Sequence, residues 1–184
     1  MVNDLKRYAY IECDYLGVIQ AEILSMIEDK STKEGWNFFD KMDIVKAPSL
    51  LQFCKDMKLI IQDFSIIYLT EPLIQHVDSL PQVVKINIPI LNTEGWSNVW
   101  YGITEEQLES SSKVTLHMDQ YQHGLTHERV ADLILPEIDR IDNLDKIIAF
   151  NSRIPHSVDM NSNALTPRIV ASLTFKKQPI ELLQ

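Results

Sequence analysis

The sequence predicts a mainly β domain with helices at its N-terminal end and a β-sandwich or jelly-roll core. Residues 1–60 contain two stretches whose apolar residues recur at helical spacing, and the roughly 110 residues that follow contain eight short β-rich segments. No internal repeat and no Gly/Ser-rich linker divides the chain. We therefore expect a single domain over 1–184, with a helical support region over about 1–60 and the β core over about 61–176.

The N-terminal region is predicted to hold a short strand over 8–13 and two packing helices. The first helix carries apolar residues three or four positions apart, which places them on one face: Leu16, Ile19, Ile23 and Ile27. Pro48 suits the first turn of the second helix, in which Leu51, Cys54 and Met57 fall on one side. Neither helix shows a group of polar residues that indicates chemistry.

The remaining chain is expected to form strands over 64–69, 83–91, 98–103, 113–119, 130–135, 146–150, 156–160 and 168–175. Alternation is clearest in the last of them, because its odd-numbered residues from Ile169 to Phe175 are all apolar. The even-numbered residues, which begin at Arg168 and include Ser172, share the opposite face. That face points either to water or into a polar cavity.

Charge and composition exclude several classes of function. The chain has 17 Lys+Arg against 26 Asp+Glu, a formal charge of −9, and its basic residues form no run, which argues against nucleic-acid binding. No apolar stretch is long enough to cross a membrane, and the N-terminus lacks the layout of a secretory signal. We therefore expect a cytoplasmic protein. Cys13 and Cys54 are expected to be reduced and buried.

Two of the five histidines are followed at the second position by aspartate, in His76-Val-Asp78 and His117-Met-Asp119. In a strand, residues i and i+2 project from the same face, so each pair can converge on a metal ion. The spacing alone is a weak signal, and His76 with Asp78 also fits a polar pair at a surface turn. The regular alternation of KVTLHMD favours a half-exposed strand for the second pair. His123 and His127 are expected in an exposed loop.

The order of segments after His76 strengthens the first pair. His76-Val-Asp78 is followed by VVKINIPIL, by NVWYGI, and much later by FNSRIPHSVDM and PRIVASLTF. This layout resembles the Fe(II)- and 2-oxoglutarate-dependent dioxygenases, whose core is a double-stranded β-helix, a cupin-like jelly roll. The resemblance covers roughly residues 60–176. The stretches KINIPILN and PHSV are similar to those of prolyl-hydroxylase-like and aspartyl/asparaginyl-hydroxylase-like members.

The resemblance implies an Fe(II) centre and 2-oxoglutarate as cosubstrate, with hydroxylation of an unidentified substrate. It assigns the metal ligands to His76, Asp78 and His156, and the grip on the far carboxylate of 2-oxoglutarate to Arg168. Ser172 and Tyr101 are further candidates for cosubstrate binding, although some members carry the serine two residues after the arginine, where this chain has Val170. Two imidazoles and one carboxylate leave adjacent positions open on an octahedral ion, and a guanidinium fork matches a carboxylate.

Other interpretations of these residues stay open at this point. His156 shares a strand face with Val158 and fits a buried core histidine, and Arg168 has many acidic side chains as potential surface partners. The aromatic group Trp96, Trp100 and Tyr101 fits core packing as well as a substrate wall. Alternative functions are a non-catalytic binding or structural module and a cupin-like metalloenzyme that uses no keto-acid. Substrate identity, oligomeric state and regulation are not predicted.

Overall fold

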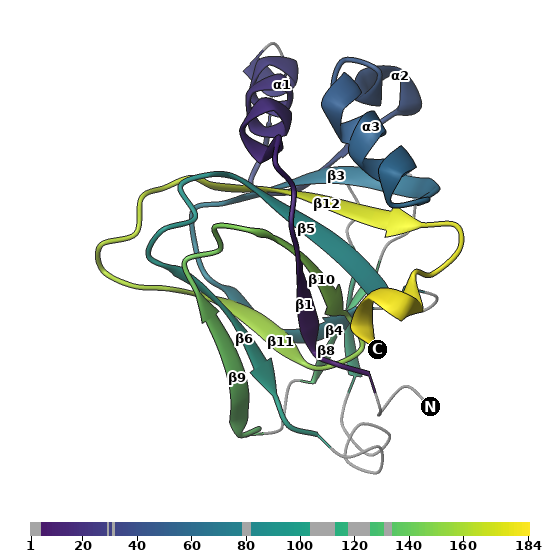
Figure 1. Ribbon diagram of the computed structural model, residues 1–184. Coiled ribbons are helices and arrows are strands. Elements are labelled where there is room, and N and C mark those ends of the chain that lie inside the picture. The colour runs from purple at the N-terminus through teal and green to yellow at the C-terminus, as the bar shows by residue number, and fades with distance from the viewer. Residues whose placement is uncertain are drawn as a thin grey trace.

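The computed structural model describes residues 5–28, 30, 32–78, 82–103, 113–117, 126–130 and 134–184, with the backbone alone for residues 41, 42, 113–117 and 126–130. Within these ranges, two six-stranded antiparallel sheets face each other, and the helices lie outside them (Figure 1). No helix in the described part of the chain is long and apolar enough to span a membrane.

The elements follow one another along the chain in this order: β1 (Tyr8–Ile11), α1 (Leu16–Glu28), β2 (Gly35–Phe39), α2 (Lys41–Ile44), α3 (Pro48–Asp56), β3 (Ile61–Leu69), β4 (Leu73–Asp78), β5 (Val84–Leu91), β6 (Trp96–Tyr101), β7 (Lys113–His117), β8 (Thr126–Val130), β9 (Glu137–Asp142), β10 (Ile147–Asn151), β11 (His156–Met160), β12 (Arg168–Phe175) and the 3₁₀ helix η2 (Ile180–Leu183).

The strand order establishes the predicted jelly roll. One sheet, here called the helix-side sheet, has the order β1-β10-β5-β12-β3-β2, and the other, the open-side sheet, has the order β7-β8-β4-β11-β6-β9. From β3 to β6 and again from β9 to β12, each successive strand lies in the sheet opposite to that of the strand before it. This winding is that of a double-stranded β-helix, and it brings segments far apart in the sequence to one point between the sheets.

Strand β12 shows how the two faces of the helix-side sheet are used. Its odd-numbered residues Ile169 to Phe175 belong to the largest core cluster, together with Ile19 and Ile23 of α1 and Leu50 of α3. These contacts place the helices on the outer face of that sheet (Figure 1). Burial of apolar residues on this face stabilises the fold by about 25 cal/mol per Å² removed from water. The even-numbered residues are consequently left to face the space between the sheets.

Three strands were missed by the sequence prediction, and a fourth was predicted only in part. β4 and β9 (EIDRID) mix polar and apolar residues, and β2 is a short, half-buried edge strand, so none of them shows a clear apolar alternation. The strand expected over 130–135 falls partly outside the described residues. Within them, Val130 belongs to β8, which begins at Thr126, and residues 134 and 135 are not part of a strand.

Helix α3 begins at Pro48 as predicted, but the buried face is different. Leu50, Phe53 and Cys54 are buried, whereas Leu51 is exposed. With the partly buried Met57, the inward residues follow the spacing i, i+3, i+4, i+7 that a broad apolar stripe requires. The sequence prediction assumed a narrower apolar face of the helix, so it included Leu51 in place of Leu50.

The two free cysteines differ in exposure, so the expectation that both are buried is wrong for Cys13, which is half-buried. Burial raises the pKa of the Cys54 thiol to about 12. At pH 8 we expect iodoacetamide to modify Cys13 and to leave Cys54 unmodified, because the thiolate is the reactive form. Mass spectrometry of the folded protein checks this result, and the protein unfolded in urea should be modified at both positions. Equal labelling of the two thiols in the folded protein would contradict it.

Candidate metal centre and its pocket

The side chains of His76, Asp78 and His156 converge at one point between the sheets. His76 on β4 lies directly opposite His156 on β11 in the antiparallel register, and their ring centroids are 4.4 Å apart. Nε2 of His76 lies 3.9 Å from Oδ1 of Asp78, and Nε2 of His156 lies 4.0 Å from Oδ2. All three residues are buried, and one ligand atom from each lies within 4.8 Å of the others.

The histidine rings are oriented by backbone carbonyl groups. Nδ1 of His76 lies 2.8 Å from the carbonyl oxygen of Ile74, and Nδ1 of His156 lies 2.8 Å from that of Ile154. A carbonyl group only accepts, so in the neutral rings Nδ1 carries the proton and donates it. Nε2 then presents a lone pair toward the point where the three side chains meet, as histidine ligands of metals do.

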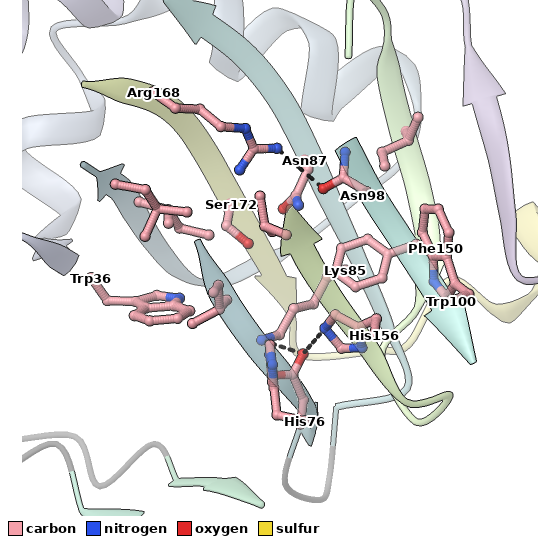
Figure 2. Close-up of a pocket in the computed structure, with 16 residues that line it drawn as sticks. Trp36, His76, Lys85, Asn87, Asn98, Trp100, Phe150, His156, Arg168 and Ser172 are labelled. Atoms are coloured by element: carbon pink, nitrogen blue, oxygen red, sulfur yellow. Dashed lines mark hydrogen bonds and ion pairs between the residues drawn. The ribbon is translucent and has the colours of Figure 1, made fainter. Parts of the chain in front are cut away.

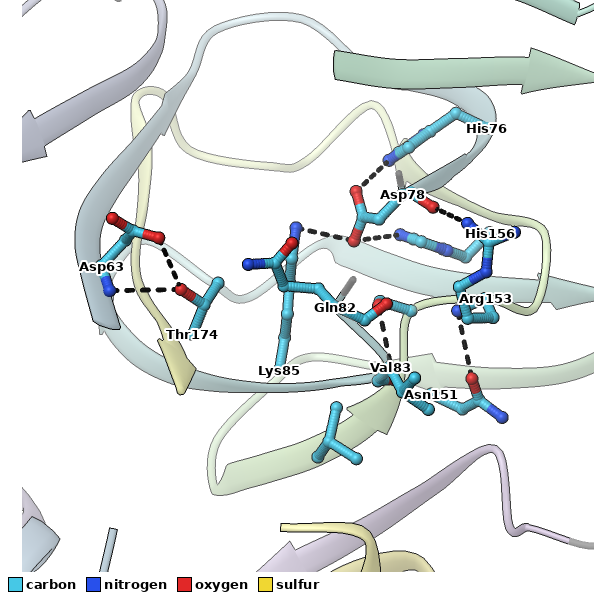
Figure 3. Close-up of polar contacts among 12 residues, drawn as sticks. Asp63, His76, Asp78, Gln82, Val83, Lys85, Asn151, Arg153, His156 and Thr174 are labelled. Atoms are coloured by element: carbon cyan, nitrogen blue, oxygen red, sulfur yellow. Dashed lines mark hydrogen bonds and ion pairs between the residues drawn. The ribbon is translucent and has the colours of Figure 1, made fainter. Parts of the chain in front are cut away.

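Asp78 is held through its backbone as well as its side chain (Figure 3). Its N–H donates to the Ser152 carbonyl over 3.0 Å, and its own carbonyl accepts from Nη1 of Arg153. Its carboxylate oxygen Oδ2 lies 2.7 Å from Nζ of Lys85 on β5. Sequence reasoning missed Lys85, although one lysine within the apolar run VVKINIPIL is itself an unusual feature.

A pocket opens from this centre between the two sheets and encloses about 500 Å³, its open mouth included (Figure 2). The polar residues from the helix-side sheet are Lys85, Asn87, Arg168 and Ser172, and Asn98 comes from the open-side sheet. The rest of the lining is apolar or aromatic: Trp36, Ile67, Leu69, Leu73, Trp100, Ile148, Phe150 and Val158.

Arg168 is 2% exposed and lines this pocket rather than the protein surface. Among the side chains that the structure describes, no carboxylate forms an ion pair with it. Its Nη2 donates to Oδ1 of Asn98 over 3.1 Å, while its Nε and the Nδ2 of Asn98 are buried without a partner in the described residues. Burial lowers the pKa of Arg168 to about 10, so the guanidinium stays charged at neutral pH. A buried cation with unused donors is the feature expected of a binding site for an anion.

The two remaining cosubstrate candidates lie in different places. Ser172 lines the pocket from β12, where it pairs in register with Asn87 on β5. Tyr101 does not line the pocket, because Asn98 and Trp100 occupy the inward face of β6 and Tyr101 lies on the other face. Its hydroxyl lies 2.9 Å from Oγ of Ser157.

The aromatic residues on and near β6 lie in different surroundings, some in the apolar core and some at the pocket wall. Trp96 is buried against Ile67, Leu69 and Val158, so it is a core residue. Trp100 lines the pocket, as does Trp36 on β2, which the sequence reasoning did not single out.

The other histidines are only partly described. Asp119 and His123 lie outside the described residues, and His117 on β7 and His127 on β8 are described by their backbone alone. The expected strand is confirmed over 113–117 by β7, whereas its exposure and the place of Asp119 stay predictions. The expectation that His127 lies in a loop is wrong, because this residue belongs to β8.

The donor set fits a ferrous ion or a similar transition metal. Two imidazole nitrogens and one carboxylate oxygen on one side of an octahedral ion constitute the facial arrangement typical of non-haem Fe(II) oxygenases. Oriented Nε2 lone pairs and burial of all three residues are the preorganisation that such a site requires.

The ion pair between Asp78 and Lys85 leads to a stability prediction. Asp78→Asn leaves the buried ammonium of Lys85 without its compensating charge, so we expect the metal-free protein to lose about 3 kcal/mol of unfolding free energy. Urea unfolding in the presence of a chelator measures this loss. The control Asp139→Asn removes a carboxylate that pairs with a more exposed Arg7, and should cost less than about 1 kcal/mol. Equal losses in the two variants would contradict the prediction.

Solved structures similar to this chain include the following three. The non-heme alpha ketoglutarate dependent carbocyclase SnoK from nogalamycin biosynthesis matches with a TM-score of 0.59 and 11% sequence identity over 95% of this chain and 84% of that chain. A Pseudomonas putida prolyl-4-hydroxylase matches with a TM-score of 0.44 and 13% identity over 97% of this chain and 91% of that chain. AviO1 from Streptomyces viridochromogenes Tue57 matches with a TM-score of 0.46 and 10% identity over 95% and 92%.

Neither a family model nor a curated protein sequence matches the chain. At 11% identity, the similarity to SnoK establishes the fold. The fold that the sequence predicts, a double-stranded β-helix, is thus confirmed.

Proposed function

We propose that this protein is an Fe(II)- and 2-oxoglutarate-dependent oxygenase that hydroxylates a small-molecule or peptide substrate and releases succinate and CO₂. One observation carries the proposal: the convergent side chains of His76, Asp78 and His156 share a pocket with the buried Arg168, which has no carboxylate partner among the described residues. This combination supplies ligands for a metal and a counter-ion for a dicarboxylate within one cavity.

His76, Asp78 and His156 would hold the ferrous ion at the end of the pocket that admits the keto-acid. The bound iron supplies the redox chemistry that the side chains lack. One oxygen atom of O₂ enters the product hydroxyl group, and the other enters succinate as the keto-acid loses CO₂.

The protein's own residues bind and orient the reactants. Arg168, supported by Asn98, would hold the far carboxylate of 2-oxoglutarate with its planar set of donors. The apolar and aromatic walls, which include Trp36, Leu73 and Phe150, would keep water away from the reacting atoms.

The test has two stages. Protein loaded anaerobically with Fe(II) should bind 2-oxoglutarate in a calorimetric titration, and admission of O₂ should then yield succinate. Loaded protein that binds no 2-oxoglutarate would refute the proposal.

The same measurements distinguish the alternatives. A protein that takes up no metal from Fe(II), Mn(II) or Ni(II) would be a binding or structural module. A protein that binds metal but does not respond to 2-oxoglutarate would be a cupin-like metalloenzyme that uses no keto-acid.

A further inference from the structure

Lys85 is a charged residue in the pocket to which the proposed function assigns no role. It projects from near the start of β5, where it is the second residue, and it is only 8% exposed. It lines the same cavity as the metal-ligand candidates (Figure 2). Its neighbours in register and along the pocket wall include Phe150 and Asn87. A lysine buried in such a position costs free energy unless its ammonium group is paired and hydrogen-bonded.

Its partners do not account for all of its donors. An ammonium group has three N–H donors, and within the described residues Lys85 contacts one acceptor, Oδ2 of Asp78 at 2.7 Å. The remaining donors lie in a cavity whose nearby walls are largely apolar. They are therefore available to a ligand that enters the pocket beside the metal centre.

The balance of charge indicates what kind of ligand this is. In the proposed complex, the two positive charges of Fe(II) and that of Arg168 are matched by Asp78 and the two carboxylates of 2-oxoglutarate. Lys85 then adds one uncompensated positive charge. In a buried site, such a charge favours an anionic partner.

We infer that Lys85 is a second anion-binding group of this pocket, which binds a carboxylate beside the metal centre. The inference rests on the proposed function. The carboxylate has two sources, an anionic substrate or the keto-acid carboxylate next to the metal, and the charge balance favours the substrate.

The first experimental arm tests the substrate as the source. Protein loaded with Mn(II) and saturated with 2-oxoglutarate under anaerobic conditions is titrated with 3-phenylpropionate and with its neutral amide, 3-phenylpropionamide. We expect the acid to bind at least about tenfold more tightly than the amide, as a charge-assisted hydrogen bond implies. This comparison uses the unchanged protein, so it does not depend on whether a variant folds.

Variants then test whether Lys85 causes the preference for the acid over the amide. Lys85→Gln should remove the preference for the acid, Lys85→Arg should retain part of it, and the surface variant Lys146→Gln, whose lysine pairs with Glu12, should leave it unchanged. Thermal melting of each metal-loaded variant verifies folding.

The second arm tests the keto-acid as the source. 2-Oxovalerate carries the keto group and the adjacent carboxylate but no distant carboxylate. A loss of about tenfold in its affinity for Mn(II)-loaded Lys85→Gln would show that Lys85 binds the keto-acid carboxylate. If the parent shows no preference for the acid and Lys85→Gln binds 2-oxovalerate as the parent does, the inference is overturned.

Failure of the proposed function would give other results than failure of the inference about Lys85. In that case the metal-loaded parent binds no 2-oxoglutarate, or Arg168→Gln binds it as tightly as the parent. The comparison of acid with amide, carried out without 2-oxoglutarate on the parent and Lys85→Gln, then still decides the role of Lys85.

Discussion

Arg168→Ala is expected to lower the affinity of the Fe(II)-loaded protein for 2-oxoglutarate by about a hundredfold or more. A guanidinium that donates two hydrogen bonds to a carboxylate contributes roughly 1.5–3 kcal/mol for each bond. The site is buried, so solvent screening weakens this interaction little. Anaerobic calorimetry on parent and variant measures the difference.

Two controls separate binding from folding in this experiment. Arg168→Lys keeps the charge but loses the planar fork, so an intermediate affinity is expected. Arg140→Ala removes an arginine that is paired with Glu137 and Asp159 away from the pocket, and should leave the affinity unchanged. Metal-free Arg168→Ala should unfold at about the same urea concentration as the parent, because the variant loses a buried charge that has no ion partner. An affinity within about threefold of the parent would remove Arg168 from the binding site.

His156→Ala is expected to weaken metal binding by more than about a hundredfold. Even the loss of a residue that merely orients a ligand costs about 10- to 100-fold in metal affinity, and loss of a ligand itself should cost more. Equilibrium dialysis against Fe(II) or Ni(II) provides the measurement. His76→Ala should give the same result, because the two rings lie opposite each other and present equivalent Nε2 atoms.

The matched control for this prediction is Phe150→Leu. The Phe150 ring lies 5.4 Å from the His156 ring and lines the same pocket, but it offers no ligand atom. This variant should retain the metal. Without metal, the melting temperature of His156→Ala should change little, because the ring borders a pocket rather than the apolar core. Metal binding at parental affinity in either histidine variant would exclude the three-residue centre.

Strand β12 shows how much of this fold the alternation of apolar and polar residues predicts. The apolar residues Ile169 to Phe175 and the opposing Arg168 and Ser172 were correctly divided between two faces, because strand alternation is a local property of the backbone. The direction of the polar face, toward water or a cavity, depended on the second sheet and was not predictable from β12. The same limit applies to β4, in which His76 and Asp78 face the pocket, so the inward side of the strand is not marked by apolar residues.

The sequence by itself determined the jelly-roll class and the main face of α1. Through the resemblance it also predicted a site of His76, Asp78, His156 and Arg168, residues that the structure brings to one pocket. These predictions depend on the periodicity of apolar residues and on the order of motifs along the chain, and both can be read from the sequence. Only the tertiary structure decided that Lys85 pairs with Asp78 and that Tyr101 lies outside the pocket. Both depend on how strands from two sheets meet in space, and that juxtaposition is set by long-range register and winding rather than by any local pattern.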